Sequence, residues 1–150
     1  MEFFTNQIVG LSKRIPDFNS RAVLFALVAG WITGVLWYLV AGKVWKSVAN
    51  QGDGGAMTPR AQILSAIAQV IMTIMLAIVM QRLGEGTTRG GLQTAFMLWF
   101  GFIATSMMVN YSNLRTRFRL TFIDSVHWLL VMLVMGAIIG ALADAPVATR

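Results

Sequence analysis

Two side chains in the most hydrophobic parts of the sequence could take part in proton chemistry, Asp124 and His127. They are the only ionisable residues within the four long apolar runs, and their i, i+3 spacing places them on one side of a helix. Ionisable residues inside a membrane are costly and often functional, so this pair could relay a proton. We favour a structural interpretation, in which these residues anchor the helix at the membrane surface. Asp124 lies only about 6 Å along a helix from Leu120, within reach of Arg117 or Arg119 at the membrane surface.

Beyond this pair the sequence offers little material for catalysis. The chain has no cysteines, a single histidine and six acidic residues scattered along its length. Thiolate chemistry and a cysteine-ligated metal are therefore excluded. We find no nucleophile–base pair, phosphate-binding loop or paired carboxylates. We therefore predict no catalytic residues, no metal ligands and no cofactor, and we do not expect an enzyme.

Uncharged polar residues also recur at helical spacing within the apolar runs. One polar face lies on the second run and consists of Gln62, Ser65, Gln69 and Thr73. A second polar face, on the third run, includes Thr94 and Thr105. Polar groups in a bilayer must find partners, so both faces should turn inward. They could line a path for a small solute or a proton, or they could form hydrogen bonds between helices. We favour the second interpretation, because none of these side chains is ionisable.

The elements that position these residues are four apolar runs, at residues 22–42, 61–80, 91–109 and 120–143. Hydrophobic residues make up 57% of the chain and charged residues 12%, too few to cover a water-facing surface. The first run is about 30 Å long as a helix, which is the thickness of a bilayer core, and the others are of similar length or longer. The loops are short. We therefore predict an all-α, integral membrane bundle of four transmembrane helices, up-down-up-down, as one domain over residues 1–150.

Helix ends and the first segment carry further signals. Thr58 and Pro59 predict the start of the second helix, Gly84 its end, and Thr88 the start of the third. Asp17, Asn19 or Ser20 is expected to cap the first. Within residues 1–20, apolar residues at helical spacing predict a short interfacial helix, with a disordered tail as the alternative.

Small residues form stripes on two of the runs, and such stripes allow membrane helices to pack closely. Either stripe could form a homo-oligomer interface or could pack helices within one bundle, and we favour the second. The residues are Ala26, Gly30 and Gly34 on the first run, and Gly136 and Gly140 on the fourth.

The net charge of +6 comes from Lys and Arg residues that lie almost wholly between the apolar runs. That distribution is typical of helix-flanking anchors rather than of a nucleic-acid-binding surface. Counting Lys and Arg gives six on each side of the membrane, and we favour cytoplasmic first and third loops. The predicted interfacial anchors are Trp37, Tyr38, Trp45, Arg115, Arg117 and Arg119.

Several short motifs, in order along residues 22–142, resemble the signatures of a bacterial domain-of-unknown-function family of small four-pass membrane proteins. They are Leu36-Trp37-Tyr38 with Gly42-Lys43-x-Trp45, Gly101-Phe102-Ile-Ala104-Thr105 with Val109-Asn110-Tyr111, and Val134-Met135-Gly136-Ala137-Ile-Ile-Gly140. The resemblance implies four helices and an inner-membrane location, and it implies no activity. The chain departs from the family pattern at Asp124 and His127, and in having Leu39-Val40-Ala41 where the family often has a proline.

Taken together, these features predict a multi-pass protein of the bacterial inner membrane. Its expected partners are the lipid bilayer and either other membrane subunits or a second copy of itself. The favoured role is a non-catalytic accessory or assembly subunit, or a homo-oligomer. The alternative is a small transporter or channel with a polar path through Asp124 and His127.

Overall fold

A computed structural model describes residues 19–48, 58–113 and 118–143, and all of this part of the chain except the short connections is helical. The elements are α2 (Ser20–Val48), α3 (Pro59–Leu83), α4 (Thr88–Leu98), the π-helix η1 (Trp99–Ala104), α5 (Thr105–Asn113) and α6 (Phe118–Ala143). The segment α4–η1–α5 runs continuously, so the described residues form four spans that are each long and apolar enough to cross a membrane. The predicted four-helix membrane bundle is confirmed.

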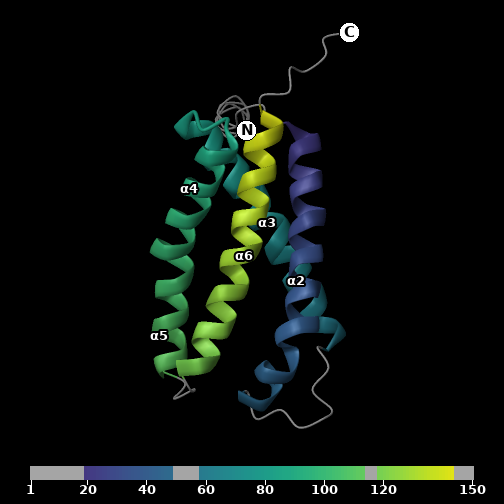
Figure 1. Ribbon diagram of the computed structural model, residues 1–150, viewed down its shortest axis with the longest axis vertical. Helices are drawn as coiled ribbons and strands as arrows, with labels where there is room; N and C mark the ends of the chain where they lie inside the picture. Colours follow the sequence, from purple (N-terminus) through teal and green to yellow (C-terminus); the bar gives the residue numbers. More distant parts are fainter. Residues whose placement is uncertain (1–18, 49–57, 114–117, 144–150) are drawn as a thin grey trace, which may run out of the picture.

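Successive spans run in opposite directions (Figure 1). The start of α2, the turn between α3 and α4, and the end of α6 all lie at one end of the bundle. The Nδ2 amide of Asn19 donates to the carbonyl oxygen of Leu142 at 3.0 Å and so ties the first described span to the last. The predicted interfacial helix lies outside the described residues, apart from its last two positions.

Capping residues mark the starts of three helices and the end of one. Thr58 caps α3 by accepting from the Ala61 amide, Pro59 is the first helical residue, and Gly84 ends the helix at φ 70°. Asn19 accepts from the amides at the start of α2. The cap of α4 is Thr87, which accepts from the Gly90 amide at 3.0 Å, so the expectation of Thr88 was one residue late.

Helix α6 lies at the centre of the bundle, between α2 and α4 (Figure 1). It carries the largest share of buried residues of any described span. The buried apolar cluster combines side chains from α2, α3, α4 and α6, namely Ala26, Leu76, Ala77, Met80, Ala95, Val131, Met132, Met135 and Ile139. Large apolar side chains such as Leu39, 74% exposed, cover the outside, as a lipid-facing surface requires.

Both predicted small-residue stripes lie at helix contacts inside the bundle. A Cβ atom added to Gly136 would collide with the backbone of Gly91, and one added to Gly140 would collide with the backbone of Thr87. These contacts join α6 directly to α4. On α2, a Cβ at Gly30 would lie 2.6 Å from Gln69 Nε2 and 2.9 Å from Met135 Cγ. The small residues therefore set the spacing between helices of one bundle.

Candidate functional site

The carboxylate of Asp124 is held by two aromatic donors from other helices. Trp45 Nε1, near the end of α2, donates to Oδ1 at 2.7 Å, and the Tyr111 hydroxyl of α5 donates to Oδ2 at 2.7 Å. Asp124 is only 9% exposed, although it lies near the start of α6. Its expected partner Arg119 is exposed, whereas Arg115 and Arg117 lie outside the described residues. Asp124 thus joins α2, α5 and α6 through hydrogen bonds to aromatic side chains.

One turn further along α6, His127 is enclosed by rings. Its imidazole centroid lies 5.1 Å from that of Trp128, 5.2 Å from Tyr38 and 6.3 Å from Trp37. Tyr38 in turn meets Trp45 edge to face, with centroids 6.1 Å apart. Tyr38 therefore connects the surroundings of His127 with the Asp124 site.

Two polar atoms in this region are buried without a hydrogen-bond partner among the described residues, Trp37 Nε1 and His127 Nε2. His127 itself is 7% exposed. Its Nε2 faces Gly34, because a Cβ added there would lie 3.3 Å from that nitrogen. Gly34 thus leaves the space that the imidazole occupies. Trp37, Tyr38 and Trp45, the predicted interfacial anchors, are half-buried and make these contacts with α6 or with each other.

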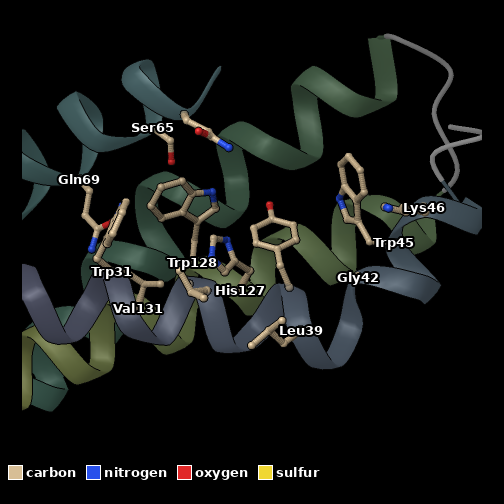
Figure 2. Close-up of a pocket in the computed structure, with 14 residues that line it drawn as sticks. Trp31, Leu39, Gly42, Trp45, Lys46, Ser65, Gln69, His127, Trp128 and Val131 are labelled. Atoms are coloured by element: carbon tan, nitrogen blue, oxygen red, sulfur yellow. The ribbon is translucent and has the colours of Figure 1, made fainter. Parts of the chain in front are cut away.

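Beside His127, a groove of about 440 Å³ opens between α2, α3 and α6 (Figure 2). Figure 2 shows Trp31, Leu39 and Trp45 on the α2 side, Ser65 and Gln69 on the α3 side, and His127, Trp128 and Val131 on α6. Lys46 lies at the end of the groove next to Trp45. The walls are thus mainly aromatic and aliphatic, with a few polar groups from α3 and α6.

The two predicted polar faces have different surroundings, and residues of the first, on α3, line the groove. Gln69 is 5% exposed and donates to the Leu27 carbonyl oxygen at 3.3 Å, which is an interhelical hydrogen bond of the kind we favoured. Gln62 lines the groove but is exposed. Thr105 is exposed on the outside of α5, where its hydroxyl donates to the Gly101 carbonyl oxygen of its own helix at 2.8 Å. The expectation that Thr105 turns inward was therefore wrong.

Beyond Gln69 the interior becomes apolar. The hydroxyl of Thr73 donates to the Gln69 carbonyl oxygen at 2.7 Å and to Met135 Sδ at 3.1 Å. Leu76 and Met135 are fully buried next to it. A second groove of about 280 Å³ lies at the opposite end of the bundle, with Ala77 and Met80 among its lining residues. Buried apolar side chains thus separate two grooves that face opposite ends.

One family comparison covers most of the chain. Residues 21–140 match the family described as "Protein of unknown function (DUF1761)". The chain belongs to this family. No curated protein and no solved structure gives a significant match.

The DUF1761 region contains the whole Asp124 site and the groove next to it. Trp45 and Tyr111, the last residues of two of the motifs quoted above, are the two donors to Asp124. The sequence predicted Trp45 only as an anchor, and it did not predict Tyr111 or Gly91 as site residues. The available signal was that Trp and Tyr carry a polar atom on an apolar body, which usually finds a partner when buried.

Proposed function

We propose that the protein is a non-catalytic accessory or assembly subunit of a complex in the bacterial inner membrane. The observation that carries this proposal is the outer face of η1 and α5. Small or polar residues are exposed there among large apolar side chains, and they include Gly101, Thr105, Ser106 and Asn110. They form two i, i+4 pairs on adjoining sides of the helix, Gly101 with Thr105 and Ser106 with Asn110, and we call the four residues together the outer face of the third span.

This outer face has the composition of a helix–helix contact in a membrane. A Cβ added to Gly101 would meet no atom within 4 Å, so a second helix can approach the backbone closely there. Polar side chains such as Asn110 gain partners when another protein covers them. The stripes at Gly30, Gly34, Gly136 and Gly140 are already used inside the bundle, so they are not available to a partner.

We also propose that the protein is not itself catalytic, because the carboxylate of Asp124 is already hydrogen-bonded. Both carboxylate oxygens accept hydrogen bonds from aromatic donors, so the acid is engaged in joining helices. Among the described residues, no group of three or more His, Cys, Asp or Glu side chains could hold a metal ion. A partner would therefore supply the chemistry of the complex.

The test is purification from native membranes in mild detergent, followed by mass spectrometry and native mass determination. A reproducible partner, or a stable homo-oligomer, is expected with the wild-type chain and should be lost with Gly101→Leu. The matched control is Ala68→Leu, which adds the same side chain at an exposed position on α3. A lone monomer from native membranes, or equal loss with both variants, would refute the proposal.

A second candidate, a small transporter, is favoured by one specific observation. The two grooves face opposite ends of the bundle, and only a short apolar barrier that includes Leu76 and Met135 separates them. Movement of α2 and α3 relative to α6 could open this barrier to either end in turn. The polar groups of the larger groove, including His127, would then face the solute.

Flux into proteoliposomes distinguishes this candidate from the first. Transport should be measured for protons and small solutes, with Asp124→Asn and His127→Ala as variants. Flux that falls in either variant, at unchanged protein insertion, would support the carrier. No flux, or flux that is indifferent to both substitutions, would remove the polar path from consideration.

A further inference from the structure

The groove beside His127 opens along the lipid-facing side of the bundle as well as towards Lys46 at its end. Its α2 wall runs from Trp31 to Lys46, about 22 Å along the helix, and most of it belongs to the apolar run at residues 22–42. Trp31 is 58% exposed and Leu39 74% exposed, so both reach the outer surface of the bundle. A molecule dissolved in the hydrocarbon layer can therefore enter the groove from the side.

The two walls differ in chemistry. Flat rings from α2 and α6, those of Trp31, Tyr38, Trp45 and Trp128, contribute the aromatic surface. The α3 wall contributes the Ser65 hydroxyl and the Gln69 amide (Figure 2). An acyl chain would cover the rings but would offer no hydrogen-bond partner to the Ser65 hydroxyl, whereas the Gln69 amide already donates to the Leu27 carbonyl oxygen. The occupant that fits both walls is flat and carries polar atoms.

His127 provides the independent sign of a ligand. It lines the groove, it is more than nine-tenths buried, and its Nε2 has no partner among the described residues. A buried nitrogen without a hydrogen bond is unfavourable. Nε2 is closed off beside Gly34, so the oxygen of a bound molecule satisfies it only when the imidazole turns toward the groove. The groove volume of about 440 Å³ lies within the range of small-molecule sites, which are mainly apolar with a few polar groups.

We propose that this groove binds a lipid-soluble ring compound that bears ring oxygens, of the quinone class, with the ring against the aromatic wall and one oxygen hydrogen-bonded to His127 Nε2. The side chains that would define the site are His127, Trp128 and Ser65, and Gly34 provides the space for the imidazole. The tail of the ligand extends along α2 into the bilayer. This site is separate from the outer face of the third span, and its test is independent of any subunit partner.

The test uses the full-length chain in nanodiscs and decylubiquinone as the probe. Binding is followed through quenching of the groove tryptophans and through the rise in unfolding temperature, which a ligand specific for the folded state produces. We expect saturable binding at one site per chain, and about tenfold weaker binding with His127→Leu, the change that follows from loss of one hydrogen bond. His127→Gln, which keeps a polar group, should recover part of the affinity.

Blocking the space should abolish binding. Ser65→Leu narrows the groove from α3, and Gly34→Leu fills the space beside His127, whereas Ala68→Leu places the same side chain at an exposed α3 position outside the groove lining as the control. Ser65→Leu remains informative if Gly34→Leu fails to fold. Quenching that is linear in probe and equal in all variants would mean partition into lipid only. Equal competition by decanol would mean a site for an alkyl chain, and unchanged affinity with His127→Leu would exclude the assigned contact. Each of these results would overturn the proposal.

Discussion

Trp45 and Asp124 lie 79 positions apart in the sequence, and a 2.7 Å hydrogen bond from the indole to the carboxylate joins them. The bond connects the end of α2 to the beginning of α6, and Tyr111 completes the site from α5. A largely buried carboxylate is costly unless its oxygens are satisfied. The bundle therefore depends on both donors at this end.

Removing either donor should destabilise the protein. Trp45→Phe and Tyr111→Phe are each expected to lower the free energy of unfolding by about 1–3 kcal/mol, because a buried acceptor loses its partner. The measurement is equilibrium unfolding in mixed micelles. Trp31→Phe is the control, since Trp31 is 58% exposed. If Trp45→Phe were no more destabilising than Trp31→Phe, the bond would contribute nothing. In an Asp124→Leu background, both donor variants should become nearly neutral.

A methyl group at the contact between α4 and α6 should be poorly tolerated. A Cβ at Gly136 would collide with the Gly91 backbone, so Gly136→Ala is expected to cost about 1–3 kcal/mol through overpacking. Gly42→Ala is the matched control, because a Cβ there meets no atom within 4 Å. That variant should be neutral or slightly stabilising, since alanine favours helix. Thermal unfolding in one detergent compares the two, and equal midpoints would contradict the close contact.

The end of α3 depends on a left-handed glycine. Gly84 has φ 70°, and its amide donates to the Gln81 carbonyl oxygen. Gly84→Ala should therefore cost about 1 kcal/mol, whereas Gly84→Asn should cost less, because asparagine tolerates this conformation better. Chemical unfolding of the three proteins measures the difference. The prediction fails if asparagine and alanine are equally destabilising.

Lipid exposure can be mapped directly, because the chain contains no cysteine that would have to be removed first. Leu39 is 74% exposed and Ala26 is fully buried, although both belong to α2. A spin label at Leu39→Cys should collide readily with oxygen dissolved in the bilayer, and a label at Ala26→Cys should be protected or should disrupt folding. Equal oxygen accessibility in two folded proteins would show that α2 faces lipid differently from the arrangement described above.

The number and the type of the spans could be predicted because length and hydropathy alone determine them. The four apolar runs were found, but each helix extends beyond its run. At α2, for example, Lys43 to Val48 continue the helix past Gly42. Polar residues at the ends of apolar runs remain helical, because the backbone hydrogen bonds still favour helix there.

The candidate site was harder to predict, because a membrane helix lacks the alternation of apolar and polar faces that reveals the interior of a soluble bundle. Trp45 fitted an interfacial anchor by position alone, and Asp124 fitted an arginine partner by reach alone. The hydrogen bond between them depends on the proximity of α2 and α6, which no local pattern encodes. The partly buried Gln69 bond to Leu27 could be anticipated, since polar groups in lipid must find partners.

The π-helix η1 explains how Tyr111 comes to meet α6 at all. Trp99 donates to the Ser125 carbonyl oxygen of α6 at 2.8 Å, and Tyr111 reaches Asp124 on the same helix. In a regular α-helix, twelve steps of about 100° would turn Tyr111 about 120° away from Trp99. Absorbing one residue in the wide π turn leaves eleven effective steps and an offset of about 20°. The π-helical segment Trp99–Ala104 thus changes the rotation of the helix by about one residue. Deletion of one residue from it would turn Tyr111 away from Asp124.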